Sequence, residues 1–263
     1  MSLIKPCKFH WDSKFWPNLH KIDPYRGCTY ACNYCWSKAL AARFGKKADW
    51  ANVEVAPGFR MGELVKFEKP ITLLIGATSD PMPPCEEKER KTWQILQRIA
   101  NFKKYANIKN KYTYLILTKN PAIVEYSPIL KEIGVWAGMS ITASPSFYQD
   151  VQAKFEPHAP SNEWRIDALE KLHEAGIKTF ISIEPWLVES TGEGFADYTN
   201  PDSIVYLTHE FIDYYIIGSW NYAGKPLKHF VPHYKSQIPL VIKALELYKK
   251  PFWIKPELLE AVR

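Results

Sequence analysis

Long apolar segments are missing from this chain of 263 residues. No apolar run approaches the ~20 residues that a membrane-spanning helix needs, which argues against an integral membrane protein. Residues Met1 to Trp16 mix Lys, His and Trp, so they lack the apolar stretch of a secretory signal peptide. Low-complexity segments and internal repeats are absent too, which argues against a disordered tail and a repeat architecture. We therefore expect a cytoplasmic protein that does not bind membranes.

Cysteines are few, and their number is odd. The chain has five, and three of them fall within eight residues; they are Cys7, Cys28, Cys32, Cys35 and Cys85. This spacing suits a disulfide framework poorly. In a reducing compartment such a group of cysteines more often binds a metal or carries out redox chemistry.

Charge of one sign is not strongly in excess. Lys and Arg number 34 against 28 for Asp and Glu, which gives a formal net charge of +6. This excess is compatible with an anionic substrate or a nucleic acid, but a solvated Lys-rich surface explains it equally well. Charge alone therefore assigns no partner.

Short apolar runs alternate with helix-like segments along the chain. Because the runs are continuously apolar rather than alternating with polar residues, they indicate the buried strands of a parallel α/β sheet. About six or seven strands suit either an open sheet or a barrel. No linker divides the chain, so we expect one domain over residues 1–263, with short extensions at 1–22 and 256–263. The expected strands are Ile71–Ile75, Tyr112–Leu117, Val135–Ile141, Thr179–Ile183, Tyr214–Ile217 and Pro251–Ile254. The expected helices are Glu87–Ala100, Ile123–Ile133 with an interruption near Pro128, Arg165–Ala175 and Pro239–Lys249.

Small and polar residues follow five of these strands. Ligands bind at the carboxyl ends of parallel strands in α/β folds, so five such segments predict one functional rim. The segments are Gly76–Asp80, Thr118–Asn120, Ser140–Thr142, Glu184–Trp186 and Gly218–Asn221.

The most specific motif is Cys28-x₃-Cys32-x₂-Cys35. Three thiolates this close can converge on one metal centre, and soft thiolates select zinc, iron or iron–sulfur clusters. A structural zinc site needs four protein ligands, whereas the motif offers three. Cys7, Cys85, His10 or His20 could supply a fourth, but no spacing requires it.

This motif, with the aromatic Tyr34 just before the third cysteine, closely resembles the signature of the radical S-adenosylmethionine (SAM) superfamily. The resemblance implies a partial (β/α)₆ TIM-type barrel with a [4Fe–4S] cluster that leaves one iron open to bind SAM. An external flavodoxin- or ferredoxin-like donor would supply the electron that cleaves SAM to a 5′-deoxyadenosyl radical. That radical would abstract hydrogen from a substrate that is not identified, with nucleotides or nucleic acid as one candidate class. We expect the enzyme to be a monomer.

Further segments resemble two branches of this superfamily, over about Asp23 to Lys255. Asp23–Cys28, Ser140–Ala143, Glu156–Ser161 and Arg165 are similar to the spore-photoproduct-lyase-like branch. The second half is nearer to a phage- and plasmid-associated group, through Ser182–Pro185, Ile216–Ser219 and Phe252–Lys255.

The resemblance also implies roles for single residues. The cluster ligands would be Cys28, Cys32 and Cys35, and the Tyr34 ring would lie against the adenine of SAM. Ser79 and Asp80 stand where the superfamily has a Gly-Gly-Glu-like stretch for the SAM amino group, although a plain turn before Pro81 is the alternative. The remaining SAM contacts would be Ser140, facing the ribose or methionine, and Arg165, pairing with the methionine carboxylate unless it lies on a solvated helix face.

Three residues are candidates for the substrate side of the site. Glu184 and Lys255 follow buried-looking strands, and they would act in the pocket or form a structural ion pair. Cys85 is a thiol on the expected rim; spore photoproduct lyase uses a cysteine as a hydrogen donor, but Cys85 does not match that cysteine's motif, and an inert buried thiol is the alternative. The alternative for the whole chain is a zinc or iron–sulfur structural module that binds nucleic acid without catalysis.

Overall fold

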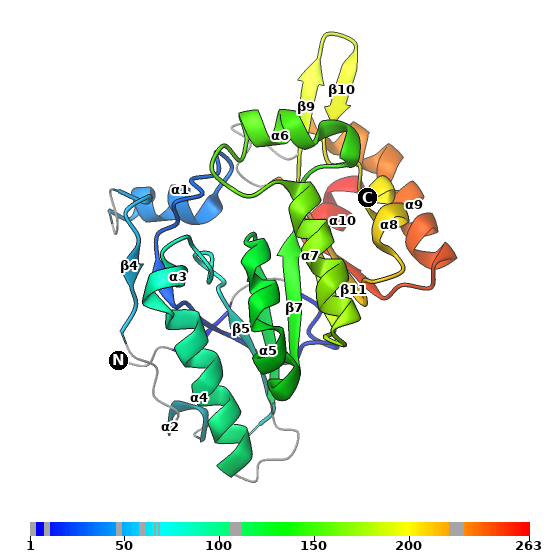
Figure 1. The fold of residues 1–263 in the computed structure, drawn as a ribbon. Helices are drawn as coiled ribbons and strands as arrows, with labels where there is room; N and C mark the ends of the chain where they lie inside the picture. Colours follow the sequence, from blue (N-terminus) through cyan, green and yellow to red (C-terminus); the bar gives the residue numbers. More distant parts are fainter. Residues whose placement is uncertain are drawn as a thin grey trace.

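The protein is described by a computed structural model that covers residues 4–7, 11–45, 49–57, 62–65, 67, 69–105, 112–220 and 229–263. Within these residues the central element is an open, curled sheet of eight strands, a half-barrel (Figure 1). Seven strands run parallel, and β1 pairs antiparallel at one edge. In spatial order the strands are β1 (Lys5–Pro6), β2 (Leu19–Ile22), β5 (Ile71–Ile75), β6 (Tyr112–Thr118), β7 (Val135–Ser140), β8 (Thr179–Trp186), β11 (Tyr214–Ser219) and β12 (Phe252–Ile254).

Helices cover the outer face of this sheet, and α4, α5 and α7 lie along β5 and β7 in Figure 1. A large hydrophobic core fills the space between the helices and the outward side chains of the strands. No helix in the described part of the chain is long and apolar enough to span a bilayer. The helices are α1 (Trp36–Arg43), α2 (Gly62–Val65), α3 (Glu86–Glu89), α4 (Lys91–Tyr105), α5 (Ser127–Ile133), α6 (Tyr148–Lys154), α7 (Asn162–Glu174), α8 (Pro201–Thr208), α9 (Val231–Leu247) and α10 (Pro256–Val262), with 3₁₀ turns at η1 (Pro121–Tyr126) and η2 (Pro145–Phe147).

Two small antiparallel pairs stand outside the main sheet. Strand β3 (Tyr25–Arg26) pairs with β4 (Glu54–Val55) next to the cysteine motif. The hairpin of β9 (Val188–Thr191) and β10 (Gly194–Asp197) projects from the end of β8 (Figure 1).

All six expected strands are present, but some boundaries differ. Strands β8 and β11 extend to Trp186 and Ser219, so parts of the expected rim are strand rather than loop. Asn221 lies outside the described residues. Leu19–Ile22, expected in an N-terminal extension, forms β2 beside β5. This segment is half polar and has no apolar run, but its backbone hydrogen-bonds to β5.

The expected helices differ in two places and agree in a third. The segment Glu87–Ala100 is divided between α3 and α4 at Arg90, whose φ is +51°. The interruption expected near Pro128 is present, since η1 ends at Tyr126 and α5 begins at Ser127 with Pro128 in its first turn. Pro239 lies inside α9 rather than at its start, since Val231 begins this helix and its packing tolerates the missing N–H.

The concave face of the half-barrel holds a second core, here called the inner core. Trp11 and Trp16, from the expected extension, pack among side chains of four strands. Its buried members are Trp11, Trp16, Leu74, Ala77, Leu115, Phe180, Tyr214 and Ile216.

Gly138 on β7 makes room for the inner core. A Cβ at Gly138 would lie 2.2–2.4 Å from ring atoms of Phe180. We expect Gly138→Ala to lower the free energy of unfolding by about 1–3 kcal/mol, because Phe180 must leave its position. Gly192→Ala is the matched control, since a Cβ there meets no atom within 4 Å. Urea unfolding of both variants measures the difference, and equal stabilities would show that the interior accommodates the methyl group.

Candidate functional site

A cavity of about 580 Å³ opens at the carboxyl ends of the strands, above the inner core. Side chains that face inward become small and polar here, as at Ser140 and Ser182. Nine of the residues expected in the site line the cavity, whereas Cys85 and Arg165 do not. The nine are Cys28, Cys32, Tyr34, Cys35, Ser79, Asp80, Ser140, Glu184 and Lys255.

The three cysteines of the motif lie on one loop, residues 28–35, here called the cysteine loop. At its start, the Cys28 N–H donates to the Trp50 carbonyl at 2.9 Å. At its end, Cys35 caps α1, and its Sγ accepts from the Lys38 N–H at 3.4 Å. In the middle, Asn33 donates from its backbone N–H to the Phe155 carbonyl at 2.9 Å and from its side chain to the Lys154 carbonyl at 2.6 Å. The loop is thus attached at both ends and at its centre.

Two of these thiols are neutral in the metal-free protein. Burial raises the pKa of Cys28 to about 12, and the nearby Asp80 adds to the rise. Burial is likewise the main cause that raises the pKa of Cys32 to about 12, and the nearby Glu156 charge adds to the rise. A bound metal centre would supply the positive charge that a buried thiolate lacks.

The donor set fits an iron–sulfur cluster. Three soft sulfur ligands face a common cavity, whose remaining volume leaves space beside them for a further ligand. Among the described residues, no three His, Cys, Asp or Glu side chains are grouped around a position for one metal ion.

Ser79 and Asp80 line the cavity but are also bonded to the protein. The Ser79 hydroxyl donates to the Tyr25 carbonyl at 2.5 Å. The Asp80 carboxylate accepts from the Thr118 hydroxyl at 2.6 Å and from the Lys119 and Met82 N–H groups at 2.8 Å. Burial raises the pKa of Asp80. Asp80 thereby joins the ends of β5 and β6. Its bond to the Met82 N–H belongs to a turn around Pro81, which is the alternative role expected for this segment.

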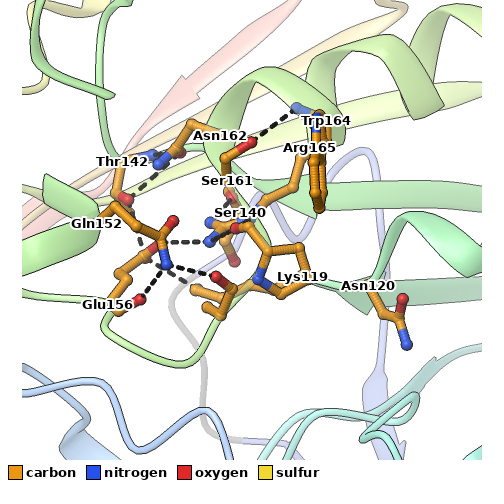
Figure 2. A network of polar contacts seen from close by, with 12 residues as sticks. Lys119, Asn120, Ser140, Thr142, Gln152, Glu156, Ser161, Asn162, Trp164 and Arg165 are labelled. Atoms are coloured by element: carbon orange, nitrogen blue, oxygen red, sulfur yellow. Dashed lines mark hydrogen bonds and ion pairs between the residues drawn. The ribbon is translucent and has the colours of Figure 1, made fainter. Parts of the chain in front are cut away.

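Arg165 is placed differently from the expectation. Its side chain is 0% exposed and does not line the cavity. It pairs with Glu156, also 0% exposed, and donates to the Ser140 and Pro160 carbonyls at 3.0 and 2.9 Å (Figure 2). The alternative of a solvated helix face is therefore wrong, whereas the contact with a SAM carboxylate stays a prediction. A buried guanidinium needs a carboxylate partner, and the protein supplies one.

Glu156 is a residue that the sequence reasoning missed as part of the site. Its carboxylate accepts from the Thr142 hydroxyl at 2.9 Å and from Arg165 (Figure 2). It also accepts from the Tyr34 hydroxyl. Burial alone would raise the pKa of Glu156, but Arg165 and Lys119 hold it below its usual value. The only signal in the sequence was its place in the Glu156–Ser161 segment that carries the family resemblance.

Lys119 lies in the Thr118–Asn120 segment of the expected rim, but the sequence gave it no role of its own. Its ammonium lines the cavity, 3.8 Å from the Glu156 carboxylate and 5.6 Å from the centre of the Tyr34 ring. The Tyr34 ring therefore faces the cavity beside a cation, while its hydroxyl is bonded to Glu156. A lysine at the end of a strand does not by itself indicate a binding role. The proximity of Lys119 to Tyr34 arises only from the fold.

Glu184 and Lys255 form an ion pair, one of the two alternatives expected for them. Their side chains meet at 2.6 Å on the cavity wall, Glu184 being 25% exposed and Lys255 7%. Gly218, on the strand between them, leaves space for the pair, since a Cβ there would lie 3.0 Å from atoms of both side chains. The pair thus spans β8, β11 and the end of β12.

Cys85 does not line the cavity. It directly precedes α3, and burial raises the pKa of its thiol. The next residue, Glu86, is buried and accepts from the Tyr126 hydroxyl at 2.8 Å and from two N–H groups at the start of α4. This anchoring holds the segment away from the cavity. The further thiol on the cavity wall is that of Cys7, which the sequence offered only as one of four candidates for a fourth ligand.

Comparisons with known proteins agree with this arrangement. The family profile of the Radical SAM superfamily matches residues 22–189. An uncharacterized protein of Methanocaldococcus jannaschii is 28% identical over 215 residues, which cover 80% of this chain and 74% of that protein.

Solved structures share the fold. A spore photoproduct lyase mutant with bound AdoMet and dinucleoside spore photoproduct has a TM-score of 0.63 at 12% identity, covering 96% of this chain and 78% of that chain. Streptococcus suis SuiB bound to S-adenosylmethionine has a TM-score of 0.55 at 15% identity, covering 92% of this chain and 48% of that chain. These matches confirm the expected partial barrel.

Proposed function

The chain belongs to the radical SAM superfamily, and on this premise we propose that the cysteine loop and the adjoining cavity hold a [4Fe–4S] cluster and SAM. The observation that carries the proposal is that Cys28, Cys32 and Cys35 line one cavity at the carboxyl ends of the strands. When bound and reduced by an external one-electron donor, these cofactors would supply a 5′-deoxyadenosyl radical for hydrogen abstraction from a substrate. The superfamily match makes the chain a radical SAM enzyme; its substrate is the open part of the proposal.

The walls of the cavity offer groups suited to the parts of SAM. The Tyr34 ring presents an apolar face, and the Lys119 ammonium next to it would bind a carboxylate. Ser140 offers a hydroxyl for a ribose or methionine group, and Asp80 an acceptor for an amino group. In this arrangement Lys119 takes the role that the sequence assigned to Arg165.

The Glu184–Lys255 pair lies on the same cavity wall, and we assign it to the substrate side. Lys255 neutralises the charge of the Glu184 carboxylate. The pair is therefore better suited to accept hydrogen bonds from a neutral substrate than to bind an anionic one. Nucleotides or nucleic acid are the substrate class to test first, because the related fold of spore photoproduct lyase binds a dinucleoside. We also propose that residues 1–263 form one domain that acts as a monomer.

Cleavage of SAM tests the proposed function. The protein is purified without oxygen, reconstituted with iron and sulfide, reduced with dithionite and incubated with SAM, and 5′-deoxyadenosine is quantified by mass spectrometry. We expect 5′-deoxyadenosine to form only when iron, reductant and SAM are all present. No cleavage, together with one zinc ion per chain, would favour the structural module instead.

A further inference from the structure

We propose that Glu156 is a positioning residue that fixes the cysteine loop to the sheet through the hydroxyl of Tyr34. The effect on the cluster rests on the proposed function, because the loop that Glu156 fixes would carry the cluster. The geometry does not depend on that function, because it involves only protein atoms; Figure 2 shows the contacts of Glu156 with Arg165 and Thr142.

Both oxygens of the Glu156 carboxylate are bonded, and the two bind different parts of the protein. Oε1 accepts from the hydroxyls of Tyr34 and Thr142, the latter at 2.9 Å. Oε2 accepts from Arg165. Since Glu156 and Arg165 are both 0% exposed, water cannot replace either partner.

Arg165 attaches this carboxylate to the sheet. Its guanidinium also donates to the Ser140 carbonyl, at the end of β7, at 3.0 Å. Thr142, two residues beyond β7, is fixed in turn by Asn162, whose side-chain oxygen accepts from the Thr142 N–H at 2.8 Å. Glu156 therefore has a rigid position set by β7 and by the start of α7.

Tyr34 transmits this position to the cysteine loop. It directly precedes Cys35, and its hydroxyl contacts Glu156 while its ring lines the cavity. The neighbouring Asn33 bonds to the carbonyls of Lys154 and Phe155, so the same short segment before Glu156 binds the middle of the loop. Of these bonds, the one that joins two side chains is that of Tyr34 to Glu156. Its acceptor is a buried carboxylate, and a hydrogen bond to a charged acceptor is stronger than one to a neutral acceptor.

A pair of isosteric variants isolates this link. Tyr34→Phe and Thr142→Val each remove one hydroxyl that donates to the same Glu156 oxygen, but only the first hydroxyl comes from the cysteine loop. Both variants leave Glu156 and Arg165 in place, which avoids the unfolding that loss of either charge invites. The alkylation rate of Cys35 by iodoacetamide, followed by peptide mass spectrometry in the metal-free protein, reports how firmly the loop is held.

We expect Cys35 to react about tenfold faster in Tyr34→Phe than in wild type, as loss of a hydrogen bond to a charged acceptor predicts, and at nearly the wild-type rate in Thr142→Val. The melting temperatures of the two variants should agree. In iron-loaded protein, a chelator should remove iron faster from Tyr34→Phe only. If Cys35 reacts no faster in Tyr34→Phe than in Thr142→Val, the proposal is overturned. A protein that binds no iron would contradict the proposed function, while the alkylation rates still decide the role of Glu156.

Discussion

Replacing Cys32 with alanine is expected to abolish the visible absorbance of the iron-reconstituted protein and to reduce SAM cleavage to an undetectable level. Cys32 is the most buried of the three cysteines in the loop, and the motif provides no spare thiol in its place. A cluster with two protein ligands would be lost to solvent and chelators. Iron and sulfide content, with the absorption spectrum, measures the effect.

Cys85→Ala is the matched control for this variant. Cys85 is also a partly buried free thiol, but it precedes α3 and does not line the cavity. Its replacement should leave iron content and absorbance at the wild-type level. Retained absorbance in Cys32→Ala, or loss of absorbance in Cys85→Ala, would mean that the ligands are assigned wrongly.

Replacing Arg165 with methionine is expected to destabilise the fold strongly. Methionine fills a similar volume but leaves the Glu156 carboxylate buried without its cationic partner at Oε2. Removing one member of a buried ion pair costs about 3–5 kcal/mol, because the remaining charge stays desolvated. Urea unfolding of the metal-free protein, followed by circular dichroism, should show this loss in the free energy of unfolding.

Lys171→Met provides a control on the same helix. Lys171 pairs with Asp167 on α7, but both side chains are more than half exposed. Water solvates the remaining carboxylate there, so the unfolding curve should match that of wild type. A loss of about 1 kcal/mol or less in Arg165→Met would contradict the view that Glu156 depends on this ion pair.

Much of the fold could be predicted from the sequence, because buried strands consist mainly of apolar residues. Ile71–Ile75 is apolar except for Thr72 because all five side chains are buried, and it appears as β5 with the expected boundaries. Leu19–Ile22 was not recognised as a strand because its sequence, LHKI, has no apolar run, although it pairs with β1 on one side and β5 on the other. The position of Pro239 inside α9 shows that packing along a long helix can override a local stop signal.

The candidate site was predictable where spacing alone brings residues together. Cys28, Cys32 and Cys35 line one cavity because a single short loop carries them. Glu184 and Lys255 are far apart in sequence, but Glu184 lies near the carboxyl end of β8 and Lys255 directly follows β12, and the carboxyl ends of these parallel strands lie at one edge of the sheet.

Roles that depend on the direction of a side chain could not be predicted. Arg165 turns toward Glu156 instead of the cavity, and only the folded loop between them shows this. Likewise Cys85 follows a strand on the expected rim, but the anchoring of Glu86 turns its segment outward. Cys7 reaches the cavity because its backbone pairs beside β2, an arrangement that no local pattern reveals.

The central claim is that three thiols hold a cluster with an iron open to SAM, and electron paramagnetic resonance of the reduced, iron-loaded protein tests it most directly. Addition of SAM should change the signal of the reduced cluster, because SAM would become a ligand of the iron that lacks a cysteine. An iron–sulfur signal that SAM leaves unchanged, or a protein that binds zinc and shows no such signal, would contradict the claim.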